Sequence, residues 1–310
     1  MDTRAVDGLQ QQLKGAVLTS THPSYDQARR VWNGMVDRRP LVIVQPETAA
    51  AVAAAVGFAR DQGLPLSVKG AGHGVAGRAV CDDGVVIDLA RMGRVQVDAA
   101  AGVATVQGGA TLRTLDAGAQ AHGLATTAGI FRGTGVVGLA LGGGIGLLMR
   151  RYGLTCDNLL AAEVVTADGR VLEASERQHP DLFWALRGGG GNFGVVTRMD
   201  VRLHPLADVY GGRMSFPYDQ VDTLGRVYAE TMADAPDELQ IYFSVGTGGA
   251  WPSASVMLCD CGDRGLGEQT RHRLRRSLHP TADQVQRMPY LRMQQHWDCL
   301  LYTSPSPRDS

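Results

Sequence analysis

KGAGHGVAG, residues 69–77, carries the spacing G-x-G-x-x-G at Gly72, Gly74 and Gly77 and places His73 inside it. The same spacing marks the phosphate turn of Rossmann folds, where a strand precedes the turn and a helix follows it. Here LPLSVKG predicts the strand, but RAVCDDGVVIDLA, residues 78–90, predicts a turn and a second strand. A pyrophosphate would therefore find no helix N-terminus. We predict instead a loop whose backbone N–H groups face a phosphate directly, as an anion nest.

Composition and charge narrow the class of protein. The 310 residues suffice for a large core and about two domains. Lys+Arg number 30 against Asp+Glu 31, so neither a nucleic-acid nor a membrane-surface partner is expected. No apolar run reaches the roughly 18 residues that span a bilayer, and no basic-then-apolar leader begins the chain. The five cysteines are odd in number and scattered, and Cys259 and Cys261 lack a second pair at ligand spacing, which predicts reduced thiols, no metal site and a cytoplasmic location.

The apolar patterns predict mixed helices and strands. Helices are expected over 19–34, 46–63, 111–123 and 179–191, and strands over 39–46, 64–70, 193–206, in a meander over 84–109, and in a hairpin over 161–174 that turns at Asp168-Gly169. Between residues 126 and 158 a Gly-rich stretch contains one helix-like piece. Beyond Pro205 glycine clusters are fewer and the helix and strand signals are more mixed. We therefore expect an N-terminal helical segment over 1–36, one domain over 37–206 and another over 207–298.

Glycine, at 40 residues, gathers in GAGHGVAG, LGGGIG and RGGGGNFG. Each cluster indicates backbone that needs positive φ or a close approach, although a tight turn explains any single one as well. In order and spacing, KGAGHGVAG, TGVVGLALGGGIGLLMRRYGLTCDNLLAAEVVTADG and HPDLFWALRGGGGNFGVVT resemble the flavin domain of the vanillyl-alcohol oxidase and berberine-bridge-enzyme superfamily, over about residues 25–206. The resemblance implies an α+β fold: a PCMH-type FAD-binding domain of two α+β subdomains, followed by a partial α/β substrate domain.

The resemblance also implies which residues bind FAD. His73 falls where family members attach the flavin 8α-methyl carbon covalently; the alternative is a histidine that only forms hydrogen bonds in its loop. Lys69 stands where relatives commonly carry Arg, and it either lies near the phosphates or ends its strand in solvent. Doubly linked relatives carry a cysteine just before the second segment, but GIFRGTG, residues 129–135, has none, so at most one link is expected, and Cys156 is expected to be buried structure. The implied FAD-binding set is Lys69, Gly70, Ala71, Gly72, His73, Gly74, Val75, Thr134, Gly135, Gly138, Gly142, Gly143, Gly144, Gly146, Val195 and Val196, of which the two valines are also explained as core strand residues.

The implied chemistry is oxidation of a small alcohol, sugar or amine-bearing metabolite by hydride transfer to flavin N5, with O2 or another acceptor reoxidising the flavin. No catalytic base is assigned, because in relatives it tends to come from the substrate domain and the returning C-terminal segment. Two other functions stay open. One is a flavin-binding fragment without turnover, or a protein that sequesters a small molecule. The other is a reductase of the enolpyruvyl-UDP-GlcNAc type, which lacks a histidine link, so His73 argues against it.

The residues CLLYTSPSPRDS, 299–310, differ from the Arg-rich body, whose lysines are Lys14 and Lys69. Cys299 to Asp309 can be translated from a DNA sequence that resembles the transposase adapter used in preparing sequencing libraries. We therefore expect a non-native tail on a reading frame truncated near Asp298. A natural Ser/Pro-rich disordered tail is the alternative.

Overall fold

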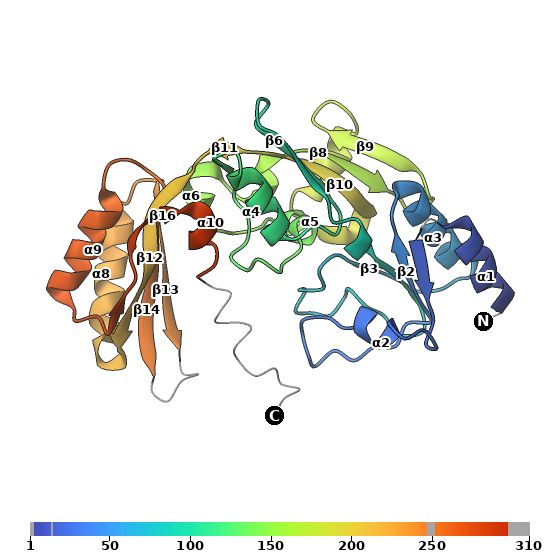
Figure 1. Ribbon diagram of the computed structural model, residues 1–310, viewed down its shortest axis with the longest axis horizontal. Coiled ribbons are helices and arrows are strands. Elements are labelled where there is room, and N and C mark those ends of the chain that lie inside the picture. Colours follow the sequence, from blue (N-terminus) through green and yellow to red (C-terminus); the bar gives the residue numbers. More distant parts are fainter. Residues whose placement is uncertain (1–2, 14, 247–251, 297–310) are drawn as a thin grey trace.

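The computed structural model describes residues 3–13, 15–246 and 252–296. Three sheets of four or five strands follow one another along an elongated molecule (Figure 1). The expected tail over 299–310 lies outside the described residues. Within them, none of the helices is both long and apolar enough to cross a membrane. The predicted α+β fold is confirmed by this mixture of helices and sheets.

The first sheet has the order β1-β2-β4-β3. Its strands are β1 (Gly15–Leu18), β2 (Val42–Pro46), β3 (Leu66–Lys69) and β4 (Val85–Asp88), with helices α1 (Thr3–Gln12), α2 (Tyr25–Ala28) and α3 (Ala49–Asp61). Strands β2 and β3 run parallel to β4 on either side of it, and α3 forms the crossover connection from β2 to β3. The Thr48 side chain caps α3 by accepting a hydrogen bond from Ala51 N at 3.2 Å. This sheet carries the loop that holds His73.

The N-terminal segment differs from the expectation for residues 1–36. It contains strand β1, which pairs antiparallel with β2, so the segment is part of the first sheet and is not purely helical. The helix expected over 19–34 shortens to the four residues of α2. Within α2, Tyr25 Oη donates to Pro40 O at 2.6 Å, which ties this short helix to the chain just before β2. Apolar spacing could not reveal this tertiary bond.

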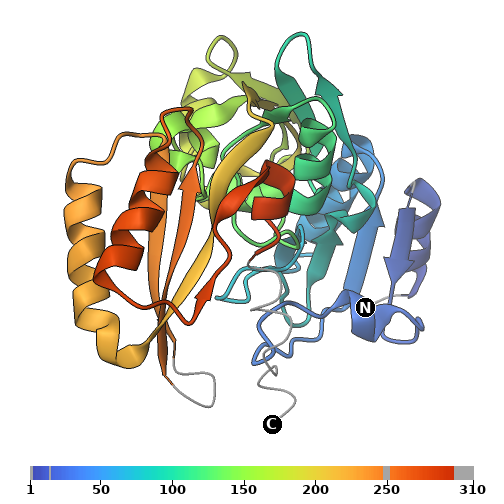
Figure 2. The same ribbon diagram turned by 60° about the vertical axis from the view of Figure 1, so that its left-hand side comes forward.

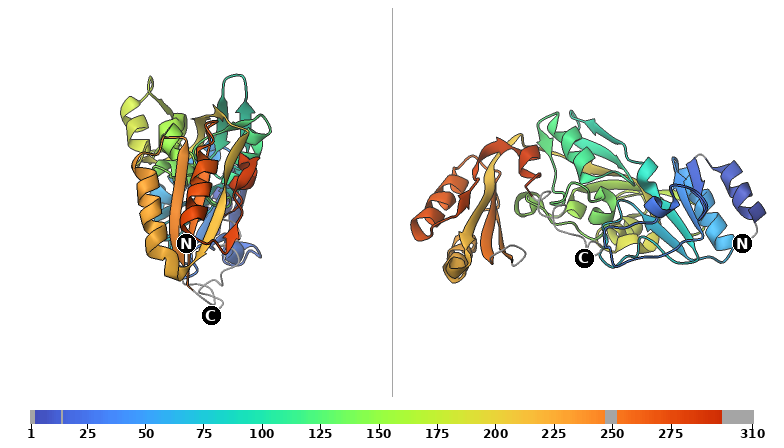
Figure 3. Two further views of the ribbon diagram at one scale, coloured as in Figure 1. Left: turned by 90° about the vertical axis from the view of Figure 1, so that its left-hand side faces the viewer. Right: turned by 60° about the horizontal axis from the view of Figure 1, so that its bottom comes forward.

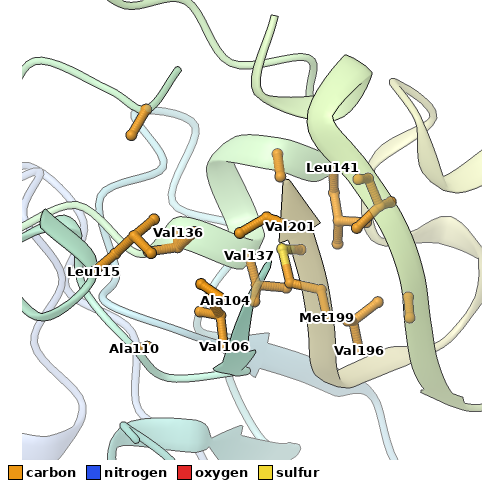
Figure 4. Close-up of a cluster of buried hydrophobic side chains, with 14 of the residues drawn as sticks. Ala104, Val106, Ala110, Leu115, Val136, Val137, Leu141, Val196, Met199 and Val201 are labelled. Carbon is orange, nitrogen blue, oxygen red and sulfur yellow. The ribbon is translucent and has the colours of Figure 1, made fainter. Parts of the chain in front are cut away.

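The second sheet is antiparallel, with the order β5-β6-β10-β8-β9. Its strands are β5 (Val95–Asp98), β6 (Val103–Gln107), β8 (Leu159–Val165), β9 (Val171–Ser175) and β10 (Val195–Arg202), and the helices beside it are α4 (Leu112–Gln120), α5 (Val136–Leu141) and α7 (Pro180–Leu186). Figure 4 shows Val137 of α5 beside Met199 and Val201 of β10, and Val136 beside Leu115 of α4, all within one buried cluster. The predicted hairpin at Asp168-Gly169 is confirmed by the pairing of β8 with β9. The predicted meander over 84–109 is wrong, because β4 belongs to the first sheet and only β5 and β6 pair with each other.

The third sheet has the order β13-β14-β12-β15, and β16 also pairs with β12. Its elements are β12 (Asp208–Pro217), β13 (Leu239–Gly246), β14 (Ser253–Asp260), β15 (Ala282–Asp283) and β16 (Gln286–Pro289), with α8 (Val221–Ala233), α9 (Leu266–Ser277) and α10 (Tyr290–Met293). Helices α8 and α9 cover the face that points away from the other sheets (Figures 1 and 3). Figure 2 shows α10 next to α4. The domain boundary near residue 206 stays a prediction.

The remaining short elements connect these sheets. They are β7 (Leu124–Ala125) and β11 (His204–Pro205), which pair with each other, α6 (Met149–Tyr152), and the 3-10 helices η1 (Leu89–Arg91), η2 (Thr155–Asn158), η3 (Gly190–Phe193) and η4 (Tyr218–Gln220). The Gly-rich stretch over 126–158 thus contains two short α-helices, α5 and α6, rather than one helical piece.

Side chains from the region of the second sheet donate hydrogen bonds to backbone carbonyls in the region of the third sheet. Arg150 Nη2 donates to Ala235 O at 2.6 Å, and Arg151 Nη1 donates to Cys261 O at 2.7 Å. In the opposite direction, Gln294 Nε2 of the third-sheet region donates to Gly129 O at 3.0 Å. Each bond pairs a buried or half-buried polar group, which stabilises the docking of the two regions.

Gly109 fixes the distance between the first and second sheets. It follows β6, and a Cβ added to it would lie 1.9 Å from the carbonyl oxygen of Leu89, which follows β4. Gly109→Ala must push the two backbones apart, and we expect it to lower the free energy of unfolding by roughly 1–3 kcal/mol. Gly57→Ala within α3 is the matched control, because its Cβ would meet only the flexible end of Arg60 at 3.9 Å. That control should raise stability by about 0.5–1 kcal/mol. Urea unfolding measures both, and equal midpoints for the two variants would contradict the close approach.

His204 makes stability depend on pH. Its ring stacks on Tyr152 with centroids 3.9 Å apart, and its Nε2 lies 2.7 Å from Asn158 Oδ1. Burial lowers the pKa of His204, and the charges of Arg202 and Arg151 lower it further. The unfolded chain therefore binds a proton at higher pH than the folded one, so stability falls as pH drops below about 6.5 and levels off below the folded pKa.

We expect His204→Gln, which has no titratable group, to weaken the loss of unfolding free energy between pH 7.5 and 5.5. The exposed His272→Gln is the control and should leave that loss unchanged. Urea midpoints at the two pH values give the comparison, and an identical pH dependence in His204→Gln and the parent would refute the assignment.

Candidate functional site

Two segments that are far apart in the sequence meet around a cavity of about 340 Å³. One is the glycine loop after β3, and the other begins α5. The lining residues are Val68, Gly70, Ala71, Gly72, His73, Gly74, Ala79, Thr134, Gly135, Gly138 and Leu139. The structure therefore brings together eight of the predicted FAD-binding residues: Gly70, Ala71, Gly72, His73, Gly74, Thr134, Gly135 and Gly138.

Backbone bonds hold the second segment in place. Leu112 N donates to Thr134 O at 2.9 Å, and Val136 N donates to Ala110 O at 3.0 Å, so the start of α5 is tied to the start of α4. Val136, Val137 and Ala140 of α5 are buried in the core. The opposite side of this short helix is therefore left to Gly138 and Leu139, which line the cavity.

The cavity walls are largely backbone. A Cβ on Gly135 would lie 3.0 Å from the backbone nitrogen of Ala71, so glycine permits the two segments to approach each other. Gly72 has a φ of 73°, a left-handed value that favours glycine. A Cβ on Gly74 or Gly138 would meet no described atom within 4 Å, so their missing side chains leave open space. Such walls fit a ligand that needs close backbone approach, as the pyrophosphate of FAD does.

His73 is the titratable side chain among the described lining residues. It is half-buried, and this burial lowers the pKa of its imidazole. The ring is therefore neutral at pH 7, with a lone pair on one nitrogen. Its ring stacks against Trp32, with centroids 5.9 Å apart and planes 16° apart. A neutral, partly desolvated imidazole has the protonation state that a nucleophile needs.

Lys69 and Val75, at the two ends of the predicted loop set, lie outside the lining. Lys69 Nζ donates to Ala28 O at 2.5 Å and lies 3.5 Å from Asp88 Oδ2, with its side chain 12% exposed. The alternative in which Lys69 ends its strand in solvent is therefore wrong, and its charge is paired within the protein. Val75 is 68% exposed, and its carbonyl accepts a bond from Asn33 Nδ2 at 2.8 Å.

The LGGGIG cluster also lies outside the lining, and part of it is explained by packing. A Cβ on Gly144 would lie 2.3 Å from Thr155 Oγ1, and one on Gly146 would lie 1.8 Å from Ala128 O. Gly143 and Gly144 have φ values of 107° and 82°. Close turns thus account for these glycines, as does the end of α5 for Gly142. An FAD contact of Gly142, Gly143, Gly144 or Gly146 stays a prediction.

Val195 and Val196 are buried in β10, between β6 and β8. The carbonyl of Val196 faces Gly108, where an added Cβ would lie 2.6 Å from it. Both valines are therefore core strand residues, and a flavin contact through their backbone stays a prediction. Cys156 is buried as expected, which raises the pKa of its thiol.

Four residues of this site were not predicted from the sequence. Val68, Ala79 and Leu139 line the cavity, and Trp32 stacks on His73. The helical spacing of α5 could have indicated Leu139, because it puts 138 and 139 opposite the buried 136, 137 and 140. The contact of Trp32 with His73 depends on how the loop after α2 folds, which the spacing of residues does not predict. Within the described residues no group of three or more metal-ligating side chains occurs, and Cys81, Cys156, Cys259 and Cys261 are free thiols.

Comparison with known proteins identifies the cofactor. Residues 40–175 match the family described as FAD binding domain. (R)-6-hydroxynicotine oxidase of Paenarthrobacter nicotinovorans is 35% identical over 279 residues, covering 88% of this chain and 60% of that protein. An FAD-linked oxidoreductase of Dictyostelium discoideum is 32% identical over 94% of this chain and 64% of its own length. The chain thus spans about 60–64% of these relatives.

Solved structures agree with the sequence matches. The crystal structure of 6-hydroxy-D-nicotine oxidase from Arthrobacter nicotinovorans superposes with a TM-score of 0.88 at 32% identity, covering 95% of this chain and 65% of that one. Xylooligosaccharide oxidase from Myceliophthora thermophila superposes with a TM-score of 0.82 at 26% identity, over 97% and 64%. The prediction of FAD as the cofactor is confirmed by these comparisons.

Gly138 offers a test of the cavity that spares the fold. Gly138→Leu adds a side chain with good helix propensity that projects into the open space, so we expect unchanged thermal stability but about tenfold weaker FAD binding. Gly225→Leu in α8 is the matched control, because its Cβ also meets no described atom within 4 Å and lies on the third sheet's helix. Flavin absorbance per polypeptide and FAD titration give the result. Full FAD content in Gly138→Leu would place the cofactor elsewhere.

Proposed function

Because this chain belongs to the PCMH-type flavoprotein family of vanillyl-alcohol oxidase and berberine-bridge enzyme, we propose that it is the FAD-binding part of an oxidase of small alcohols, sugars or amine-bearing metabolites. The observation that carries the proposal is the meeting of the loop 70–74 with residues 134–138 around His73. Neighbours whose names state activities on nicotine derivatives and oligosaccharides support an oxidase.

The residues of the cavity would divide the work of holding FAD. The backbone of Gly70 to Gly74 and of Thr134 and Gly135 binds the pyrophosphate, where the missing side chains permit close approach. When bound, FAD supplies a two-electron acceptor for hydride from the substrate, and O2 or another acceptor restores it. Fixing the cofactor in one orientation is what positions a substrate for that transfer.

His73 would anchor the flavin covalently. A bond from one of its ring nitrogens to the flavin 8α carbon would replace one hydrogen of the imidazole and one hydrogen of the methyl group. These two hydrogens, with two electrons, would pass to O2 and give hydrogen peroxide, so atoms and electrons balance. Burial favours this chemistry, because a protonated imidazole has no lone pair to donate. A single link is proposed, since no cysteine lies in the lining.

A second candidate is a flavin-binding chain without turnover. The described lining contains no titratable group other than His73, so it supplies no separate base for substrate deprotonation. The chain also spans less than two thirds of the relatives above. Production of hydrogen peroxide from a panel of alcohols, sugars and amines distinguishes the two candidates. Full FAD loading with no peroxide from any of them would favour the second.

The covalent link has a direct test. After acid denaturation, yellow fluorescence should stay on the wild-type polypeptide, and His73→Ala should release it, because the described lining holds no cysteine and no second histidine. His272→Ala, on exposed α9, is the control and should keep the link. Flavin that washes off the denatured wild type would show that His73 is only a loop histidine.

A further inference from the structure

The loop that follows α2 lies across the outer side of the glycine loop. Trp32 N donates to Gly72 O at 3.0 Å, directly before His73 in the chain. Asn33 Nδ2 donates to Val75 O at 2.8 Å, two residues after His73. These two hydrogen bonds hold the glycine loop on both sides of His73. They fix which residues of the two loops lie opposite each other, so the Trp32 side chain contacts the His73 side chain.

Trp32 and His73 form a ring pair. Their centroids lie 5.9 Å apart and their planes differ by 16°, which is an offset stack. Trp32 is 43% exposed and lies outside the cavity lining, whereas His73 is half-buried and belongs to it. The indole therefore stacks on the imidazole from outside the set of residues that line the cavity.

We propose that Trp32 is a positioning residue for His73, holding the imidazole plane in the orientation that covalent attachment of the flavin uses. The proposal rests on the proposed function, in which His73 carries the flavin. It assigns to Trp32 no contact with the cofactor. Its action is on the ring alone.

The surroundings of His73 explain why a positioning residue is needed. Its chain neighbours Gly72 and Gly74 have no side chains to restrict the imidazole, and Gly72 has the positive φ of 73°. An imidazole in such a loop samples several rotamers, of which attachment uses one. Stacking on a fixed indole selects among them. The stack also keeps water from one face of the ring, which agrees with the lowered pKa of His73.

Among the described residues, no charged side chain contributes to the pKa shift of His73. Burial is what lowers the pKa of His73. Lys69, the cation nearest in sequence, is 3.5 Å from Asp88 and bonded to Ala28 O. We therefore assign to Trp32 two effects on His73: it fixes the orientation of the imidazole ring and reduces the contact of that ring with water.

The experiment measures the rate of covalent attachment after FAD is added to apo-protein from flavin-limited cells. Trp32→Ala should attach about tenfold more slowly than wild type, near the upper end of what an aromatic pair contributes. Trp32→Phe, which keeps a planar ring, should attach within about threefold of wild type, while Trp32→Leu, which keeps apolar volume without a plane, should resemble Trp32→Ala. Trp184→Ala removes a tryptophan that is 79% exposed on α7 and is the matched control, with the wild-type rate expected.

Two further readouts separate positioning from general damage. Noncovalent FAD affinity should change by less than about twofold in every Trp32 variant, because Trp32 does not line the cavity. In the apo-protein, the NMR-measured pKa of His73 should rise toward its ordinary value in Trp32→Ala, because the imidazole gains water, and stay low in Trp32→Phe. Equal attachment rates in Trp32→Ala and wild type, or slow attachment in Trp32→Phe, overturn the proposal alone. A wild type that never links flavin overturns the attachment by His73 and this proposal with it.

Discussion

The fold depends on places where two backbones touch with no side chain between them. Gly109 lies against the carbonyl of Leu89 and thereby sets the first sheet on the second. Gly135 lies against the backbone nitrogen of Ala71 and thereby closes the cavity between the same two layers. A side chain at Gly109 would force the two backbones apart, and one at Gly135 would crowd the nitrogen of Ala71 at 3.0 Å. Glycine at position 135 thus permits the close approach of the two segments that line the cavity around His73.

The glycines of this chain have two different structural roles, and the sequence alone does not distinguish the two. At Gly144 and Gly146 the missing side chain is replaced by another part of the protein, Thr155 and Ala128. At Gly74 and Gly138 nothing among the described atoms replaces it, and the space remains open. Only the second kind provides room for a ligand. A glycine-rich motif therefore predicts close backbone approach, whereas the structure decides whether the approaching group is protein or cofactor.

Local patterns predicted the elements whose stability is local. Helix α3, with its Ala-rich body and Thr48 cap, and the β8–β9 hairpin with its Asp-Gly turn lie where the sequence predicted them. The resemblance of the glycine-rich stretches predicted the flavin-binding fold as well. Tertiary contacts decided the rest. The short helix α2, which stands where a longer helix was expected, is tied to Pro40 O by Tyr25, and β4 and β5 belong to two different sheets instead of one meander. Lys69 bonds Ala28 O, the Val75 carbonyl accepts a bond from Asn33, and Trp32 stacks on His73. The spacing of residues in the sequence predicts none of these contacts.

The junction of the third sheet uses side chains on one side and main chain on the other. Arg150 and Arg151 bond the carbonyls of Ala235 and Cys261, and Gln120 bonds the carbonyl of Leu206 at 2.7 Å. A carbonyl is present whatever residue occupies the position, so these bonds demand a chain path and no particular side chain. Substitutions at Ala235 and Cys261 that keep the chain path therefore leave these two arginine bonds available. Elsewhere the junction depends on particular side chains, because Gln294 bonds Gly129 O, and Tyr290 and Met293 share a buried apolar cluster with Leu147 and Leu148. A change of residue type is thus tolerated at the carbonyl contacts and costs packing at the apolar ones.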